Sequence, residues 1–106
     1  MGDFSHSCQH PQYDPQSTEL HAECRTYGFF GTYQPTTLLL DQYIGNINGR
    51  LMFVSYRFSA TCKNCRLGGE GNILQCYCET ENGDWISTEL ALDERIENND
   101  GHLKFK

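Results

Sequence analysis

The sequence predicts an all-β domain made of two copies of one unit and held together by disulfides. Three observations lead to this prediction: short runs in which polar and apolar residues alternate, an internal repeat, and six cysteines among 106 residues. Alternation with period two, over short runs bounded by Gly and Asn, is typical of half-buried strands. No stretch carries the apolar stripe of an amphipathic helix. We therefore expect roughly ten short strands.

The internal repeat is visible in two pairs of segments. Residues 4–8 align with residues 58–62, and residues 40–53 align with residues 92–105 with seven of fourteen positions identical. The offset is 54 for the first pair and 52 for the second, so the first copy carries two extra residues. We place these two residues in the region 27–32.

The two copies, residues 4–57 and 58–106, are expected to form one domain spanning residues 1–106. Solenoid repeats need about three or more copies to be stable. Two copies in a chain of this length therefore predict one domain with pseudo-twofold symmetry.

The spacing of the cysteines repeats with the copies. Cys8 and Cys24 are 16 positions apart, as are Cys62 and Cys78. This match favours the disulfides Cys8–Cys24 and Cys62–Cys78. A small domain stapled in this way is typical of an oxidising compartment or of secretion.

The two remaining cysteines, Cys65 and Cys76, lie between Cys62 and Cys78, and we expect a third disulfide, Cys65–Cys76. The alternative is a zinc site of four thiolates that also uses Cys62 and Cys78. The C-x-C half departs from the usual ligand spacing, and copy one would lack the site. We therefore expect no metal and no other cofactor.

Strands and loops follow from local signals. The clearest alternating runs, in chain order, are 18–24, 72–78 and 89–92. Residues 10–17 contain two prolines and are expected to form an irregular loop.

Glycine-containing turns separate the strands. Asn-Gly or Asp-Gly pairs, which favour tight hairpins, occur at 48–49, 82–83 and 100–101, and residues 27–31 form the matching turn of copy one. One short helical turn is expected over residues 41–44 and another over 93–96, each with its Asp as the N-cap.

Aromatic residues divide into two groups by their place in the repeat. Tyr33 and Trp85 match each other and are expected in the core, as are the paired phenylalanines Phe4, Phe53, Phe58 and Phe105. The others have no apolar equivalent in the other copy and are candidates for a ligand surface: Tyr27, Phe29, Phe30 and Tyr56.

The charge balance and the apolar runs exclude several classes. Eight Lys and Arg against fourteen Asp and Glu give a net charge of −6, whereas nucleic-acid-binding proteins present basic faces. No apolar run is longer than four residues, so we expect no membrane span, and no signal peptide is visible. The histidines and carboxylates are dispersed, so we do not expect an enzyme.

Two polar turns recur at the same place in both copies, Asn46-Ile47-Asn48-Gly49 and Asn98-Asn99-Asp100-Gly101. One interpretation is plain turn chemistry, because Asn, Asp and Gly tolerate left-handed backbone. The other is recognition of a polyol, since a carboxylate or amide accepts hydrogen bonds from neighbouring sugar hydroxyls.

These residues resemble the cyanovirin-N family of carbohydrate-binding proteins, over nearly the whole chain. The matching motifs are Phe4-Ser5-x-Ser7-Cys8, Cys24, Leu40-Asp41-x-x-Ile44-x-Asn46-x-Asn48-Gly49-x-Leu51 and their second-copy counterparts. The resemblance implies an elongated fold of two lobes, each taking strands from both copies. Lobe A would comprise residues 1–43 plus 95–106, and lobe B residues 44–94.

The resemblance also implies a function. It implies a lectin for α1-2-linked mannose at the ends of high-mannose glycans and glycoproteins, with one site per lobe and without catalysis or metal. The expected state is a monomer, with a domain-swapped dimer, formed through the linker 54–57, as the alternative.

Site positions of the family carry over to both lobes. In lobe A they fall on Gly2, Asp3, His6, Ser7, Arg25, Thr26, Tyr27, Asn98, Asn99, Asp100 and Gly101. In lobe B they fall on Asn46, Asn48, Tyr56, Arg57, Thr61 and Thr80. The family pattern is broken in lobe B at Gly45, Asn48, Arg57, Ala60, Glu79 and Glu81. Lobe A, with Asp100 where lobe B has Asn48, is expected to be the main site, and lobe B to be weak or silent.

Overall fold

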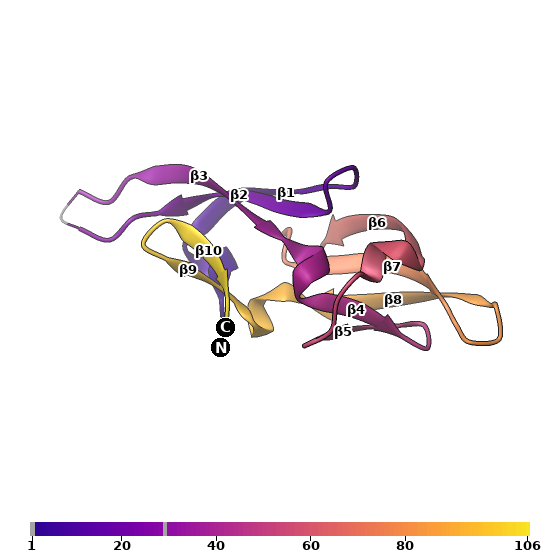
Figure 1. Ribbon diagram of the computed structural model, residues 1–106. Helices are drawn as coiled ribbons and strands as arrows, with labels where there is room; N and C mark the ends of the chain where they lie inside the picture. The colour runs from indigo at the N-terminus through magenta and orange to yellow at the C-terminus, as the bar shows by residue number, and fades with distance from the viewer. Residues whose placement is uncertain (1, 29) are drawn as a thin grey trace.

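Figure 1 shows the computed structural model of the chain, which describes residues 2–28 and 30–106. Its principal extents are 54 × 21 × 21 Å, so the molecule is elongated. The regular elements are strands joined by turns and by single turns of 3-10 helix. The expected all-β fold is confirmed. No helix in the described residues is long and apolar enough to cross a membrane.

Each copy supplies one three-stranded antiparallel sheet and one two-stranded hairpin. The elements of copy one are β1 (Cys8–Asp14), β2 (Glu19–Arg25), β3 (Tyr33–Leu39), β4 (Ile44–Ile47) and β5 (Arg50–Phe53). Those of copy two are β6 (Cys62–Gly68), β7 (Ile73–Glu79), β8 (Trp85–Ala91), β9 (Ile96–Asn99) and β10 (His102–Phe105). In both sheets the order of strands in space is their order in sequence.

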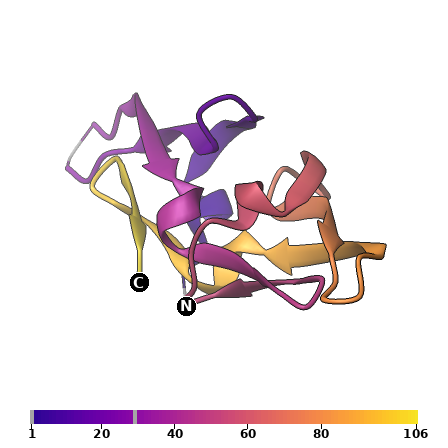
Figure 2. The ribbon, with the colours of Figure 1, turned by 45° about the vertical axis from the view of Figure 1, so that its right-hand side comes forward.

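The hairpins are exchanged between the copies. Strand β10 packs against β2 and β3 of copy one, and β5 packs against β7 and β8 of copy two. Figure 2 shows the yellow C-terminal hairpin lying beside the first sheet and the β4–β5 hairpin beside the second. Each sheet is therefore covered by a hairpin from the other copy.

Equivalent apolar residues from both copies form the core. The fully buried side chains occur as repeat pairs: Phe4 and Phe58, Leu20 and Leu74, Leu40 and Leu92, Ile44 and Ile96, and Cys24 and Cys78. On strands β2 and β7 the buried positions alternate with less buried ones, as the period-two pattern predicts.

Two of the predicted core residues are not in the core. Tyr33 is 48% exposed and Trp85 is 42% exposed. Each is the first residue of an edge strand, β3 or β8, next to the loop that precedes the strand. Lys63 Nζ lies 4.2 Å from the centre of the Trp85 ring, a cation–π contact across the outer face.

The short helices lie where the two copies contact each other. They are η1 (Phe4–His6), η2 (Leu40–Gln42), η3 (Phe58–Ala60) and η4 (Leu92–Glu94). The prediction that Asp41 and Asp93 cap their own helices is wrong, because each lies inside the first turn. Their carboxylates instead accept hydrogen bonds from a backbone N–H and a hydroxyl of the other copy, Ser59 for Asp41 and Ser5 for Asp93.

All six cysteines lie in the described residues and form the disulfides Cys8–Cys24, Cys62–Cys78 and Cys65–Cys76. These are the pairs expected from the repeat. Since every sulfur is bonded to another sulfur, these cysteines offer no thiolate to zinc.

The expected irregular loop over residues 10–17 is wrong for its first half. Strand β1 continues to Asp14, with a bulge between Gln9 and Gln12. Pro11 fits there because a proline is tolerated in an edge strand at a bulge, where no ladder N–H is needed. The corresponding bulge in β6 lies between Lys63 and Arg66 and holds Cys65.

Candidate functional site

The two recurring polar turns form two-residue hairpin loops. Asn48 and Gly49 join β4 to β5, and Asp100 and Gly101 join β9 to β10, all four with positive φ. Positive φ at both central positions is the backbone that Asn-Gly and Asp-Gly favour. The turn chemistry therefore fixes the position from which Asn48 and Asp100 project.

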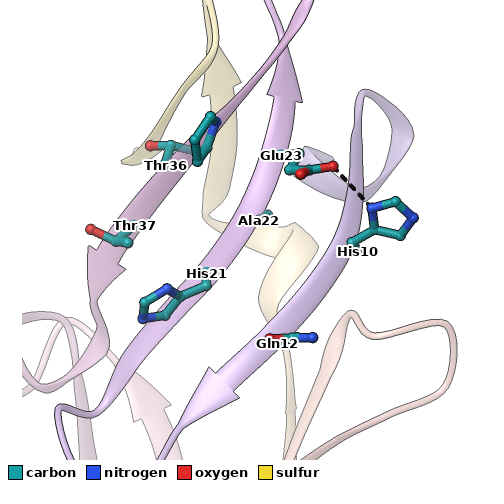
Figure 3. A pocket seen from close by; sticks show the side chains of 8 residues that line it. His10, Gln12, His21, Ala22, Glu23, Thr36 and Thr37 are labelled. Atoms are coloured by element: carbon teal, nitrogen blue, oxygen red, sulfur yellow. Dashed lines mark hydrogen bonds and ion pairs between the residues drawn. The ribbon is translucent and has the colours of Figure 1, made fainter.

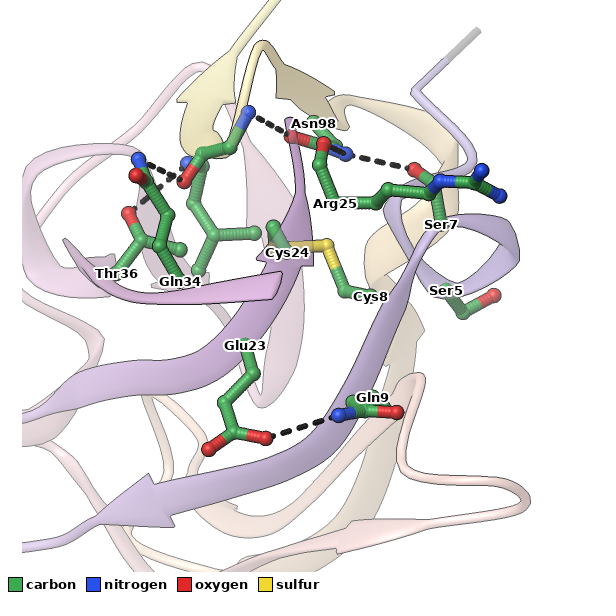
Figure 4. The surroundings of a disulfide bond; sticks show 12 residues. Ser5, Ser7, Cys8, Gln9, Glu23, Cys24, Arg25, Gln34, Thr36 and Asn98 are labelled. Carbon is green, nitrogen blue, oxygen red and sulfur yellow. Dashed lines mark hydrogen bonds between the residues drawn. A yellow bond between two sulfur atoms is a disulfide. The ribbon is translucent and has the colours of Figure 1, made fainter. Parts of the chain in front are cut away.

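Asn98 holds the second turn in place (Figure 4). Its side-chain Nδ2 donates to Ser7 Oγ at 3.0 Å and to the carbonyl of Arg25 at 2.8 Å, while its Oδ1 accepts from Gly101 N at 2.8 Å. Both N–H groups of the amide are thus engaged within the protein. Asn98 positions the turn against η1 and β2.

Asn46 plays the same part in the other lobe. Its Nδ2 donates to Thr61 Oγ1 and to the carbonyl of Glu79, both at 2.9 Å, and its Oδ1 accepts from Gly49 N at 2.7 Å. The repeat is therefore preserved at the level of single hydrogen bonds.

Asp100 and Asn48 dock onto the loop that follows the neighbouring central strand. Asp100 Oδ1 accepts from Tyr27 N at 2.8 Å, and Asn48 Oδ1 accepts from Glu81 N at 3.0 Å. The side-chain group that remains beside this oxygen differs between the lobes. The Asp100 carboxylate keeps a second, charged acceptor, whereas the Asn48 amide keeps an NH₂ donor. The two lobes thus present opposite hydrogen-bonding groups at equivalent positions.

Most predicted site residues of lobe A gather around this turn. Ser7 and Arg25 contact Asn98, Tyr27 contacts Asp100, and a Cβ at Gly101 would lie 2.9 Å from Thr26 Cγ2. Asn99 directly precedes Asp100, and its backbone pairs with His102 across the hairpin.

Two predicted residues lie toward the other end of β9, and a third lies in η1. Asp3 bridges to Glu97, and the backbone N–H groups of Gly2 and Asp3 donate to the carbonyl of Asp93. A Cβ at Gly2 would come within 2.0 Å of the carbonyl oxygen of Ile96, so close packing explains this glycine. His6 occupies the last position of η1 and is exposed.

The lobe B turn borders a shallow hollow of about 290 Å³. Its lining includes four predicted site residues, Asn46, Asn48, Thr61 and Thr80. The other lining residues are Glu79 and Glu81, where the family pattern is broken, and Ile47. Tyr56 and Arg57 are not among the lining residues and lie in the linker between the copies. Ile47 was missed from sequence, although its place beside the turn and its 52% exposure mark it.

The loop that carries Tyr27 differs between the lobes. In both lobes the loop is closed by one pair of backbone groups, Thr26 N to Thr32 O and Thr80 N to Asp84 O, each 2.7 Å. Five residues lie between the closing residues in copy one and three in copy two. The two extra residues are therefore where the changed repeat offset places them.

A larger hollow, of about 530 Å³, lies on the outer face of the first sheet (Figure 3). His10 Nδ1 lies 2.9 Å from Glu23 Oε1, and this hydrogen bond is the main cause that lowers the pKa of Glu23. The ring of His21 points away from this pair in Figure 3, so the three groups do not converge.

The equivalent face of the second sheet has a hollow of about 350 Å³ lined by different chemistry, including Arg66, Gln75 and Tyr77. Both hollows lie beside the bulges of β1 and β6. Their position therefore follows from the repeated fold, whereas the side chains that line them differ.

Comparison with known proteins agrees with this architecture. The family model described as the CVNH domain matches residues 4–104. The chain belongs to the CVNH family, the cyanovirin-N homologues. A curated cyanovirin-N homologue from Tuber borchii is 33% identical over 87 residues, 82% of each chain.

Solved structures of CVNH proteins superpose over the whole molecule. A microvirin:mannobiose complex matches with 44% identity, full coverage of both chains and a TM-score of 0.84. The CVNH protein of Gibberella zeae matches with 35% identity, 99% and 98% coverage and a TM-score of 0.86. This CVNH chain thus shares both sequence and fold with proteins of its family along its full length.

Proposed function

We propose that this chain is a lectin that binds α1-2-linked mannose at the ends of high-mannose glycans, and that it does so without catalysis. The observation that carries the proposal is the full-length, 44% identical match to a microvirin seen in complex with mannobiose. The polar turns support it, because each presents a fixed side-chain group beside exposed backbone at one end of the molecule.

We also propose that the main site is in lobe A, residues 1–43 plus 95–106, and is centred on Asp100. Asp100 offers a charged acceptor to vicinal hydroxyls, and charge-assisted hydrogen bonds are the stronger kind. Most of the proposed contact groups of lobe A lie around it, and Asn98 positions the turn through Ser7 and Arg25.

Lobe B, residues 44–94, is proposed to bind weakly or not at all. Asn48 replaces the carboxylate, and Glu79 and Glu81 line the adjacent hollow. The hollow itself supports a second candidate, in which lobe B also holds a sugar. The two candidates differ in which turn a disaccharide perturbs.

A titration of ¹⁵N-labelled protein with α1-2-mannobiose tests the assignment of the sites. We expect shifts of the amides of Tyr27 and Gly101, with those of Glu81 and Gly49 nearly unchanged. Shifts confined to Gly49 and Glu81 would contradict the assignment to lobe A, and no shifts in either lobe would contradict the lectin function.

A reciprocal exchange of the two turn residues tests the role of the carboxylate. Asp100→Asn keeps the acceptor for Tyr27 N and removes the charge, so binding in lobe A should weaken by about 1.5–3 kcal/mol. Asn48→Asp should strengthen binding in lobe B. Unchanged affinity in both variants, measured by calorimetry, would argue against a direct contact.

We further propose that the protein is a secreted monomer that binds high-mannose glycoproteins. Three disulfides favour an oxidising environment. Size-exclusion chromatography of fresh and concentrated samples distinguishes the monomer from a swapped dimer.

A further inference from the structure

The outer face of the second sheet carries a hollow that the proposed sugar sites do not use. Its volume is about 350 Å³, and its lining includes Arg66, Gln75, Cys76, Tyr77, Ser87 and Glu89. All six residues lie on β6, β7 or β8, outside the two polar turns. Small-molecule sites in proteins commonly have volumes of about 300–1,000 Å³. The hollow therefore has room for a ligand of its own.

Three side chains, one from each strand, form a polar ladder in this hollow. Arg66 Nε donates to Gln75 Oε1 at 3.1 Å, and Gln75 Nε2 donates to Glu89 Oε2, also at 3.1 Å. A Cβ at Gly68 would lie 2.6 Å from Gln75 Cδ, so the glycine leaves room for the amide. Within the described residues, the other guanidinium N–H groups of Arg66 and the Oε1 atom of Glu89 have no hydrogen-bond partner. The ladder thus presents donors at one end and an acceptor at the other.

Tyr77 supplies an aromatic ring beside the ladder. It lies two residues from Gln75 on the same face of β7, lines the hollow and is 47% exposed. In the described part of the chain its ring makes no contact with another ring or with a cation. The ring of Trp85, on the neighbouring strand, is instead covered by Lys63 Nζ at 4.2 Å. Of these two rings, Tyr77 is the one left open to a ligand.

The first sheet shows that the fold does not require these side chains. It has the same strand order and an equivalent bulge. Glu23 stands there at the position of Tyr77, and the row equivalent to the ladder is Gln12, His21 and Thr37. The ring and the ladder are therefore features of the second sheet alone.

The charges and the cross-link of the hollow indicate which ligand fits. Arg66 and Glu89 are its two charged lining residues, and their charges are of opposite sign. An anion would meet the Glu89 carboxylate and a cation the Arg66 guanidinium, whereas a neutral polyol both donates and accepts hydrogen bonds. The Cys65–Cys76 disulfide ties β6 to β7 beside the hollow. Groups that are held in place before binding lose less freedom when a ligand arrives.

We propose that this hollow is a carbohydrate site separate from the two turns, and that it takes one neutral hexopyranose ring. The ring packs its apolar face on Tyr77, because C–H groups with partial positive charge suit the negative face of an aromatic ring. Its hydroxyls accept from the Arg66 guanidinium and donate to the Glu89 carboxylate, and such charge-assisted hydrogen bonds are the stronger kind. The site does not depend on which lobe binds mannose. Together with a turn site, it allows one molecule to hold two sugars of a branched glycan and so gain avidity.

The side-chain N–H groups of the ladder report on the hollow directly. We would titrate ¹⁵N-labelled protein with α1-2-mannobiose, with N,N′-diacetylchitobiose and with a sulfated heparin disaccharide. The signals of the Gln75 side-chain amide and of Arg66 Nε–H should shift with at least one of the two neutral disaccharides and stay unchanged with the sulfated one. The Gly101 amide reports binding in lobe A in the same spectra.

Matched variants test the role of the ring. Tyr77→Ser should weaken binding at the ladder roughly three- to tenfold, whereas Tyr77→Phe keeps a ring and should retain it. Tyr33→Ser removes a ring that is 48% exposed on the first sheet and should leave this affinity unchanged. Intermolecular NOEs between Tyr77 ring protons and sugar C–H protons give a readout that a purely structural role does not produce.

The outcomes separate this site from the lectin function proposed above. Ladder signals that respond to neither neutral disaccharide overturn the sheet site, and a shift of the Gly101 amide in the same spectra leaves the lobe A function standing. Ladder signals that shift while the Gly101 amide does not would support the sheet site and contradict the lobe A assignment. Binding of the sulfated disaccharide alone, or equal binding by Tyr77→Ser and wild type, overturns the proposal.

Discussion

Asn46 and Asn98 each tie a hairpin turn to two other segments through the hydrogen bonds of one side-chain amide. An amide suits this role because it donates and accepts at once. A carboxylate could not donate to the backbone carbonyls of Arg25 and Glu79. The site residues that project toward a ligand therefore depend on neighbours whose polar atoms face the protein.

Replacing Asn98 with alanine should lower stability. The variant leaves the carbonyl of Arg25 and the N–H of Gly101 without their partner, and we expect the free energy of unfolding to fall by about 1–3 kcal/mol. Urea unfolding followed by circular dichroism measures the change. The matched control is Asn99→Ala on the same strand, whose side chain makes no hydrogen bond within the described residues and which should change stability by less than about 0.5 kcal/mol. Equal losses in the two variants would contradict this role of Asn98.

Burial could not be deduced for every residue from the repeat. The match between Tyr33 and Trp85 predicts an equivalent environment, and the structure gives them one, at the exposed start of β3 and β8. It does not say whether that environment is buried. The alternation within β2 and β7 does carry that information, and Leu20 and Leu74 are fully buried as predicted.

At the level of elements, the two three-stranded sheets have equivalent bulges that hold different residues. In β6 the bulge holds Cys65, bonded to Cys76 of β7. In β1 the equivalent residue is Pro11, and Ala22 takes the place of Cys76. The first sheet thus forms the same strand pairing without the third disulfide.

Removal of the third disulfide should therefore cost stability without loss of the fold. For the double variant Cys65→Ala, Cys76→Ala, which opens a loop with a sequence separation of 11, we expect a loss of about 2–3 kcal/mol. Chemical denaturation under non-reducing conditions measures it. A variant whose amide spectrum shows loss of the β6–β7 pairing would contradict the expectation.

Two of the helical turns, η2 and η4, could be located approximately from sequence, but their caps could not, and η1 and η3 were not predicted. Asp41 and Asp93 match the pattern of an N-cap, yet their partners Ser59 and Ser5 come from the other copy. Local patterns cannot reveal a partner that is supplied by tertiary structure. The same holds for the bulge at Pro11. The proline suggests a loop, and only the pairing of β1 with β2 on both sides of the bulge shows that the strand continues.

At the scale of the whole molecule, the linker between the copies is a strained segment. Val54 has φ 61° and is 75% exposed, and Arg57 has φ 63°. A β-branched residue in the left-handed region is disfavoured by contact between its Cβ and the backbone. The linker holds this conformation because Arg57 N donates to the carbonyl of Asp41 at 2.7 Å.

Val54→Gly should therefore stabilise the monomer. Relief of the left-handed strain exceeds the extra entropy of glycine in the unfolded chain, and we expect a net gain of about 0.5–1 kcal/mol. Urea unfolding measures the gain, with Val54→Ala as the control that keeps a Cβ and should gain less. A Val54→Gly variant less stable than wild type would show that the linker is not strained.

The exchanged hairpins have a consequence for how such a chain is made. A polypeptide ending after Arg57 would hold β1–β3 without the β9–β10 hairpin that packs on them, so the native packing of the first sheet is complete only once the last residues have been made. Two such half-chains would cover each other by trading their β4–β5 hairpins. The duplicated chain therefore has the architecture of a fused homodimer. Fusion also allows each half to vary independently. The third disulfide in one half and the longer loop that carries Tyr27 in the other are examples.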